Sequence, residues 1–372
     1  MLFRQIFNLL TKEPKVILLY GPRQVGKTTL MRRILAETSL SYLLLNGDDL
    51  RAHEVLQPNL DKLLALVGNK QLLVIDEAQR IENIGLTLKL LYDHVGLPIF
   101  ITGSSSLDLA NKINEPLTGR TAIFTMYPLA WEELPAPSPL LSNLQRLEDL
   151  LRYGSYPSLF ALSNEDKEHY LYDLVNTYLY RDILTFERVR KPQKVVDLLT
   201  LLALQIGSEV STAELAGRLA LSKPIVEKYL DLLVKMFVVV NLRGFSRNLR
   251  NEISKTSKYY FTDIGLRNAL IRNFNPLHLR QDIGAMFENF CIIERMKLYH
   301  NRRAYANFYF WRTYAQREID LVEETQGQLH AFEFKWRQAK GNAKAAAEFC
   351  EAYPGSTFHT ISPENLDNFL SR

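Results

Sequence analysis

Glycine, lysine and threonine residues between Gly21 and Thr28 stand at the spacing of a phosphate-binding loop. The loop follows the apolar run Val16–Tyr20 and precedes a helical pattern that begins near Lys27. In such a loop, backbone N–H groups cradle nucleotide phosphates, the lysine reaches the β- and γ-phosphates, and the threonine hydroxyl binds Mg²⁺. The segment therefore predicts binding of ATP or GTP, through Gly21, Pro22, Arg23, Gln24, Val25, Gly26, Lys27, Thr28 and Thr29.

Two acidic residues end a second apolar run. Gln71–Ile75 has the composition of a buried strand, and Asp76 and Glu77 follow it directly. In phosphoryl transfer, an Asp at the tip of a strand holds Mg²⁺, and a neighbouring carboxylate polarises the attacking water. We therefore expect Asp76 to share the metal ion with Thr28, and Glu77 to act as the general base.

Small hydroxyl residues end a third apolar run. The strand candidate Pro98–Thr102 is followed by a glycine and three serines. Ligands of open α/β sheets bind at the carboxyl ends of the strands, so Thr102 or Ser104 is placed to hydrogen-bond the γ-phosphate or the attacking water. A Gly-Ser turn is also ordinary loop chemistry, and both interpretations stay open.

A second set of charged residues lies near the C-terminus. The runs 317–322 and 329–336 are typical of two strands of a hairpin joined by 323–328, after a helical pattern at 285–298. Side chains alternate between the faces of a strand, so carboxylates and a lysine gather on one side. They predict a Mg²⁺ site for phosphodiester hydrolysis, unless they are simply solvated charges. The expected members are Glu288, Asp320 and Glu333, with Lys335 as a partner that does not bind the metal.

The elements that position these residues follow an α/β pattern. Strand candidates at 16–20, 41–45, 72–75, 99–102 and 121–126 alternate with helical patterns, which is typical of a doubly wound parallel sheet. A proline-rich segment at 135–139 then marks a boundary. The apolar spacing from 142 to 190 is helical, and we interpret it as a lid.

Three helical segments at 195–205, 212–219 and 223–235 precede a β-rich run at 237–242. Helices in this order followed by two strands predict a winged helix, whose second helix enters a DNA groove and whose wing is the basic segment 243–258. Winged helices also serve as protein-packing modules, which remains the alternative. The basic residues expected to contact nucleic acid are Lys223, Lys228, Arg243, Arg247, Arg250, Lys255 and Lys258.

Composition narrows the class of protein. A length of 372 residues predicts two or three domains, and a net charge of +4 is too small by itself to indicate a nucleic-acid partner. No apolar run approaches the roughly 20 residues of a membrane span, and the start has no basic region typical of a secretion signal. Cys291 and Cys350 are expected to be reduced, in a cytoplasmic protein.

In combination, these motifs resemble a large group of bacterial and archaeal ATPases that join an AAA-type P-loop domain to a C-terminal domain of unknown function. The resemblance covers nearly the whole chain. The segments that carry it are Gly21–Thr29, Asp76–Arg80, Gly103–Ser105, Leu117–Arg120, Tyr127–Leu129, Gly154–Pro157, Tyr180–Asp182, Ser222–Pro224, Ser246–Asn248, Gly284–Asn289 and Glu318–Asp320.

The resemblance implies an α/β chain of four parts. These are a P-loop AAA-type ATPase core (1–135), a helical lid (136–192), a winged-helix domain (193–275) and a C-terminal restriction-endonuclease-like α/β domain (276–372). Arg120 and Arg181 match recurrent arginines of the group, and each is a candidate arginine finger, second sensor or salt-bridge partner. AAA relatives further imply a homo-oligomeric ring, such as a hexamer.

The resulting expectation is a cytoplasmic enzyme without a membrane partner that hydrolyses ATP with Mg²⁺. It would bind and remodel DNA, and its expected substrate is branched or recombination-type DNA such as four-way junctions. Two alternatives stay open: a nucleotide-controlled signalling switch, and an ATP-gated, Mg²⁺-dependent nuclease in defence.

Overall fold

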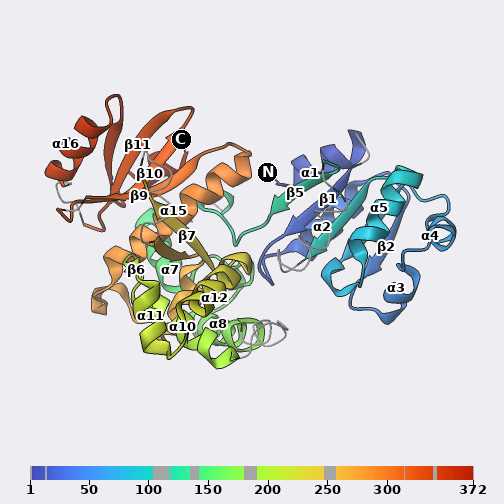
Figure 1. Ribbon diagram of the computed structural model, residues 1–372, viewed down its shortest axis with the longest axis horizontal. Helices are drawn as coiled ribbons and strands as arrows, with labels where there is room; N and C mark the ends of the chain where they lie inside the picture. The colour runs from blue at the N-terminus through green and yellow to red at the C-terminus, as the bar shows by residue number, and fades with distance from the viewer. Residues whose placement is uncertain are drawn as a thin grey trace. The chain divides into compact units, whose positions relative to one another are not determined.

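The computed structural model describes residues 2–12, 15–103, 117, 119–134, 142–179, 191–246, 257–313, 315–337 and 342–371. They form two compact units (Figure 1). The N-terminal unit comprises residues 1–127 with 235–237, and the C-terminal unit comprises 128–234 with 238–372.

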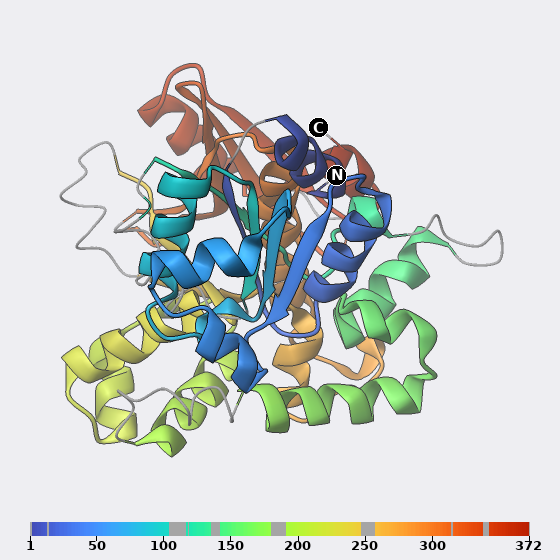
Figure 2. The same cartoon turned by 90° about the vertical axis from the view of Figure 1, so that its right-hand side faces the viewer.

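A five-stranded parallel sheet forms the centre of the N-terminal unit (Figure 2). Its spatial order is β2-β3-β4-β1-β5, so β1 lies between β4 and β5. The parallel sheet predicted from the sequence is confirmed, and each strand lies within one residue of its expected position. The strands are β1 (Val16–Tyr20), β2 (Tyr42–Asn46), β3 (Leu72–Asp76), β4 (Ile99–Gly103) and β5 (Thr121–Thr125).

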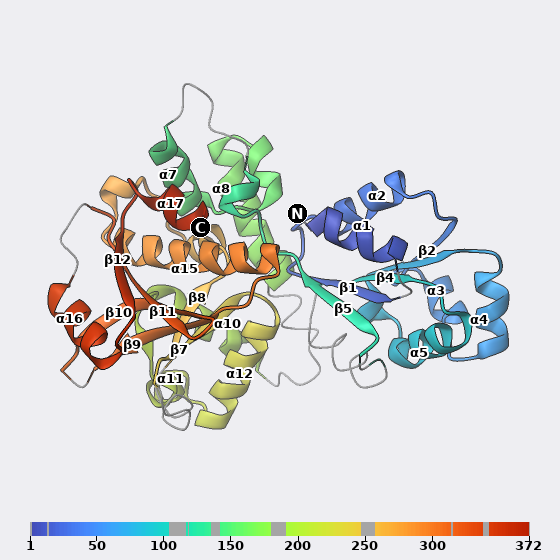
Figure 3. The same cartoon turned by 90° about the horizontal axis from the view of Figure 1, so that it is seen from above.

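Helices cover both faces of this sheet (Figure 3). One face packs on α1 (Leu2–Lys12) and α2 (Lys27–Glu37). The other face packs on the remaining helices of the unit, and β1, β3 and β4 are therefore buried along their whole length. Those helices are α3 (Leu50–Val55), α4 (Leu60–Val67), the 3₁₀ turn η1 (Ala78–Arg80) and α5 (Ile84–Val95).

The C-terminal unit begins with helices. The region expected to be a lid is helical, and its α7 packs against α14 and α15 (Ile283–Arg302) of the same unit. The helices of this half are η2 (Trp131–Glu133), α7 (Asn143–Tyr153), η3 (Pro157–Ala161), α8 (Asn164–Asp173), the π-helical η4 (Leu174–Leu179), α10 (Pro192–Leu204), α11 (Thr212–Leu219), α12 (Lys223–Lys235) and α14 (Ile264–Leu270).

A seven-stranded sheet follows, in the order β12-β11-β10-β9-β7-β8-β6. Its β10–β11 pair confirms the predicted hairpin, with a turn at Gln326 and Gly327 that is tighter than the loop expected at 323–328. The strands are β6 (Glu209–Val210), β7 (Val239–Gly244), β8 (Ser257–Phe261), β9 (Asn307–Arg312), β10 (Glu318–Thr325), β11 (Gln328–Phe334) and β12 (Thr357–Ile361).

This sheet runs across the domain boundary expected at residue 275. Arg243 and Gly244 of β7 pair in parallel with Tyr309 and Phe310 of β9. The strands expected in a winged helix and those expected in the C-terminal domain therefore belong to one sheet. The helix–helix–strand–strand order of 212–261 is the predicted one, while its classification as a winged helix, and the four domain ranges, stay predictions.

Long-range packing encloses the sheet on both faces. A core formed by α15 (Ile283–Arg302) and α17 (Leu366–Ser371) covers one face. The short turn η5 (Leu277–Leu279) precedes α15 in the chain. A smaller core around α16 (Ala343–Ala352) covers the other face. In the described parts of the chain, no helix is both long and apolar enough to cross a lipid bilayer.

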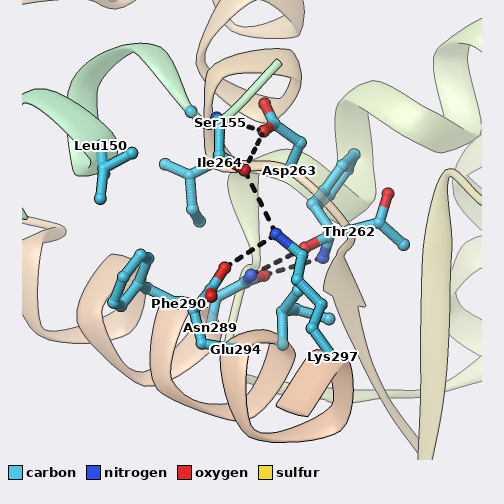
Figure 4. Close-up of a pocket in the computed structure, with 12 residues that line it drawn as sticks. Leu150, Ser155, Thr262, Asp263, Ile264, Asn289, Phe290, Glu294 and Lys297 are labelled. Atoms are coloured by element: carbon cyan, nitrogen blue, oxygen red, sulfur yellow. Dashed lines mark hydrogen bonds and ion pairs between the residues drawn. The ribbon is translucent and has the colours of Figure 1, made fainter. Parts of the chain in front are cut away.

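A buried polar network connects the segment after α7 with the N-terminus of α14 and with α15 (Figure 4). The Asp263 carboxylate accepts hydrogen bonds from the Ser155 N–H at 2.7 Å and the Leu266 N–H at 3.0 Å. The Lys297 ammonium lies 3.2 Å from the Ser155 hydroxyl and 2.7 Å from Glu294. A Cβ at position 154 would lie 2.1 Å from an Asp263 oxygen, so the segment Gly154–Pro157 needs its glycine for this close approach.

Candidate functional site

The loop between β1 and α2 has the backbone of a phosphate cradle. Gln24 and Gly26 have φ angles of 61° and 99°, the left-handed backbone that occurs in anion-binding turns. Gly26 precedes α2 directly and, as a glycine, leaves the N-terminus of this helix uncovered by a capping side chain. A Cβ at position 21 would lie 2.1 Å from the Met126 carbonyl oxygen, which explains the glycine there.

The Lys27 ammonium lies inside this loop. It donates hydrogen bonds to the Gly21 and Pro22 carbonyl oxygens, at 2.8 and 2.6 Å, and the side chain is only 6% exposed. The two carbonyl oxygens hold the ammonium at the loop, where nucleotide phosphates would lie. Lys27 therefore lies where phosphate charge would be neutralised.

Three elements meet at the Asp76 carboxylate. The Thr28 hydroxyl at the start of α2 donates to Asp76 Oδ2 at 3.0 Å, and the Thr102 hydroxyl at the end of β4 donates to Asp76 Oδ1. The carboxyl ends of parallel strands lie at one edge of a sheet, which is why residues so far apart in sequence meet here. A hydroxyl and a carboxylate at this separation are a fitting oxygen pair for Mg²⁺.

Thr102 is fully buried and also accepts a hydrogen bond from the Glu77 N–H at 3.3 Å. It therefore positions both acidic residues. The sequence predicts that Thr102 or Ser104 lies beside the γ-phosphate, but it does not predict the hydrogen bond from Thr102 to Asp76. Ser104 lies outside the described residues.

The Glu77 carboxylate has a partner that the sequence did not reveal. Glu77 has a φ of 49°, in the left-handed region, and the Gln79 amide donates a hydrogen bond to Glu77 Oε2. The 3₁₀ turn η1, which begins directly after Glu77, brings these side chains together. Gln79 thus orients the carboxylate expected to act as a base.

A cavity of about 490 Å³ opens beside Thr28 and Asp76. Arg32 and Arg51 contribute cationic side chains to its wall, together with apolar residues of β2 and α3. The cavity, the loop and the acidic pair all belong to the N-terminal unit. The loop and the acidic pair form a site suited to a nucleotide with its metal ion, and the cavity adjoins that site at Thr28 and Asp76.

Arg120 lies at the end of the sheet opposite its own phosphate loop. Its carbonyl oxygen accepts a hydrogen bond from the Val16 N–H, so it lies at the start of β1, whereas the phosphate loop follows the end of that five-residue strand. A strand rises about 3.3 Å per residue, which separates Arg120 from its own loop by more than 10 Å. Arg120 pairs with Asp93 at 2.9 Å, as in the salt-bridge role that the sequence left open, and its roles as arginine finger or second sensor stay predictions.

The expected metal site in the C-terminal unit also differs from the prediction. Glu288 binds the Lys258 ammonium and the Tyr260 hydroxyl, and Glu333 binds Lys335 at 2.7 Å. Among the residues that the structure describes, no three His, Cys, Asp or Glu side chains are arranged to hold a metal ion. Glu288, Asp320 and Glu333 are therefore not assembled as one set of ligands, because protein cations and N–H groups already occupy their oxygens.

Asp320 is nevertheless unusual. It lies where β10 has an irregular register against β9, and its Oδ2 accepts a hydrogen bond from the Phe334 N–H at 2.8 Å. Burial, followed by repulsion from Glu288, raises the pKa of Asp320 to about 8. This carboxyl group therefore carries a proton much more readily than an exposed aspartate does.

The residues expected to contact nucleic acid divide into three groups. Lys223, Lys228 and Arg243 are exposed. Lys258 is only 1% exposed and is paired with Glu288 and Glu318, which corrects its assignment as a phosphate contact. Arg247, Arg250 and Lys255, like the candidate finger Arg181, lie outside the described residues.

The family comparisons agree with a nucleotide-binding N-terminal unit. Residues 13–135 match a family described as an AAA domain, and residues 144–277 and 283–365 match two domains of unknown function, DUF8612 and DUF4143. The solved Walker-type ATPase paby2304 of Pyrococcus abyssi has a similar fold, with a TM-score of 0.51 and 18% identity over 72% of this chain and 94% of that one. The fold and the site together define the N-terminal unit as a P-loop, AAA-type nucleotide-binding domain.

Two relatives found by sequence have a higher identity to this chain than the solved ATPase has. The chain is 33% identical to the uncharacterized protein Rv2008c of Mycobacterium tuberculosis over 325 residues, which cover 86% of this chain and 70% of the relative. It is 24% identical to the uncharacterized protein MJ1544 of Methanocaldococcus jannaschii, over 75% of this chain and 66% of that protein. The chain belongs to the same family as Rv2008c.

Proposed function

We propose that this protein is an AAA-type ATPase that hydrolyses ATP and uses the energy to bind and remodel DNA, with branched or recombination-type DNA such as four-way junctions as its substrate. The hydrogen-bonded set Thr28–Asp76–Thr102 beside the phosphate loop carries the first half of this proposal. Thr28 and Asp76 supply metal ligands, and the adjacent Glu77 supplies a base, which a protein that only binds nucleotide does not need.

Each of these side chains has a distinct task in hydrolysis. Lys27 neutralises negative charge that shifts toward the leaving group, and the loop N–H groups hold the phosphates in line. Glu77, oriented by Gln79, accepts a proton from the attacking water. Mg²⁺, when bound through Thr28 and Asp76, offsets the charge on the phosphate oxygens.

Thr102 has a measurable part in this arrangement. Thr102→Val keeps the shape of the side chain but leaves Asp76 Oδ1 without its hydroxyl donor. We expect Mg²⁺-dependent ATP hydrolysis to fall about 10- to 100-fold, as for other residues that orient metal ligands. Thr102→Ser, which keeps the hydroxyl, should remain close to the wild type. Steady-state rates over a Mg²⁺ titration measure the effect, and equal rates for both variants would contradict this role.

The proposed DNA contact rests on the exposed basic residues of the C-terminal unit. Lys223 and Lys228 lie on the solvent side of α12, because Val226, Leu230 and Leu233 turn the opposite side into the core. Arg243 is exposed near the end of β7. Exposed cations on a helix and on a neighbouring strand suit the spaced phosphates of a nucleic-acid backbone.

Replacing Lys223, Lys228 and Arg243 together with Ala should weaken DNA binding and make it less sensitive to salt. Each phosphate contact that is lost lowers the slope of log affinity against log salt by about 0.9. A triple variant of the exposed Lys62, Lys70 and Lys344 is the matched control, because it removes the same charge from other elements. If both triple variants show the wild-type slope, DNA binds elsewhere.

Assembly into a homo-oligomeric ring is part of the same proposal. Arg120 and its partner Asp93 are both about one-third exposed, so a neighbouring subunit could draw the guanidinium away from Asp93. Under this proposal, Arg120 acts as an arginine finger on the nucleotide of the next subunit. Loss of such a finger lowers hydrolysis by about 10³–10⁵ in related phosphoryl transfer.

One observation favours a second candidate, a nucleotide-controlled signalling switch. The exposed side of α12 also carries Glu227 and Asp231, and Glu227 lies 3.7 Å from the Lys223 ammonium. A surface of mixed charge is suited to a protein partner as well as to DNA. Hydrolysis that ignores DNA of every form would favour the switch.

A further inference from the structure

The carboxylates of the C-terminal sheet surround a cation that belongs to the chain itself. The Lys258 ammonium on β8 lies 3.2 Å from Glu288 Oε1 on α15 and hydrogen-bonds Glu318 Oε1 on β10. Its side chain is 1% exposed and also lies over the Phe310 ring, 5.6 Å from the centroid. Lys258 therefore occupies the centre of the acidic cluster.

This ammonium stays charged in spite of its burial. Burial by itself lowers the pKa of a lysine, but Glu288 and Glu318 outweigh that effect and raise the pKa of Lys258 to about 12. A buried carboxylate needs a paired charge or a metal ion, and here the lysine meets that need. Lys258 therefore offsets part of the negative charge of the cluster, while the remaining repulsion from Glu288 helps to keep the pKa of Asp320 raised.

Several of the oxygens that a metal would need already accept hydrogen bonds. Glu288 Oε1 is shared by Lys258 and the Tyr260 hydroxyl, which donates at 2.6 Å. Glu333 accepts from Lys335 through one oxygen and from the Asn342 N–H, at 2.6 Å, through the other. A divalent ion would have to displace these donors and would meet the positive charge of Lys258 at close range.

We propose that Lys258 is the built-in cation of this cluster and takes the place of a divalent metal, so that the site joins β8, α15 and β10 instead of cutting phosphodiester bonds. The lysine connects a strand from before residue 275 with a helix and a strand from after it. This assignment makes the C-terminal unit a binding or coupling element rather than a metal-dependent nuclease.

Mn²⁺ binding to the nucleotide-free full-length chain tests this assignment, with Mn²⁺ counted by electron paramagnetic resonance. Every protein in the test carries Asp76→Asn, which removes the metal ligand of the N-terminal unit. We expect no Mn²⁺ to bind to the protein with Lys258 intact. Lys258→Met should bind about one ion per chain, because Glu288, Glu318 and Asp320 then lack their cation, and adding Glu288→Gln should abolish that binding.

Lys258→Arg is the matched control, because it keeps the positive charge and should bind no Mn²⁺. The proposal would be overturned if the protein with Lys258 intact binds Mn²⁺ and loses that binding on Glu288→Gln. This outcome does not depend on whether Lys258→Met folds. A folded Lys258→Met protein, judged by its circular dichroism, that binds no Mn²⁺ would overturn it as well. Incubation of labelled DNA with Mg²⁺ adds a further readout, in which cleavage that disappears in Asp320→Ala would also contradict the proposal.

Discussion

Lys27→Ala is expected to abolish nucleotide binding, whereas Glu77→Gln should bind nucleotide as the wild type does and fail to hydrolyse it. The Lys27 ammonium is held inside the phosphate loop by two carbonyl oxygens, and its loss removes the positive charge that faces the phosphates. Glu77→Gln keeps the shape of the side chain but cannot accept a proton. Loss of a general base lowers a rate by about 10²–10⁴-fold.

Binding of a fluorescent ATP analogue and release of phosphate measure the two effects separately. Lys70→Ala and Glu82→Gln are matched controls, because both residues are exposed in the same unit and neither takes part in the site. Equal loss of binding in Lys27→Ala and Glu77→Gln would show that the roles of charge neutralisation and base are wrongly assigned.

Arg295→Met should destabilise the C-terminal unit by about 3–5 kcal/mol, the usual cost of leaving a buried charge without its partner. The guanidinium binds Glu323 through two hydrogen bonds, at 2.7 and 3.1 Å, and donates a third to the Phe369 carbonyl oxygen at 2.6 Å. The side chains of Arg295 and Glu323 are 7% and 2% exposed. Removal of the arginine therefore leaves the buried Glu323 carboxylate without its cation, with the neutral Tyr299 hydroxyl still donating to it.

Urea denaturation followed by circular dichroism measures the change in the free energy of unfolding. The double variant Arg295→Met with Glu323→Gln removes both charges and should recover part of the lost stability, because no unpaired ion then remains. A loss below about 1 kcal/mol in the single variant would place Arg295 among weakly contributing surface pairs.

The fold and the site of the N-terminal unit could be predicted from the sequence because short, contiguous segments determine them. Each buried strand is a short apolar run, and the loop glycines, Lys27 and Thr28 are contiguous between one strand and one helix. Since the ends of parallel strands meet at one edge, Asp76 could be placed beside Thr28 without coordinates. Local sequence patterns do not reveal the spatial order of the strands. The position of Arg120 beside the start of β1 follows from the pairing of β5 with β1, so the sequence could not predict it.

The C-terminal unit shows what local patterns leave out. Lys258 was grouped with the neighbouring basic residues as part of a wing, yet it lies in β8, where it and Tyr260 face the same way and both bind Glu288. Alternation along 257–261 is the signal that would have placed Lys258 beside the buried Tyr260. The pairing of β7 with β9 joins residues that are far apart in sequence, and no periodicity predicts such a contact.

The most direct test of the account is the steady-state rate of ATP hydrolysis with and without DNA. Wild-type protein is assayed alone and with linear, forked and four-way DNA of equal length, and Glu77→Gln gives the background. The account predicts Mg²⁺-dependent hydrolysis that rises on addition of DNA, most with the four-way form. A rate that no form of DNA changes would contradict the proposal of a DNA-remodelling ATPase, and a wild-type rate equal to that of Glu77→Gln would contradict ATP hydrolysis itself.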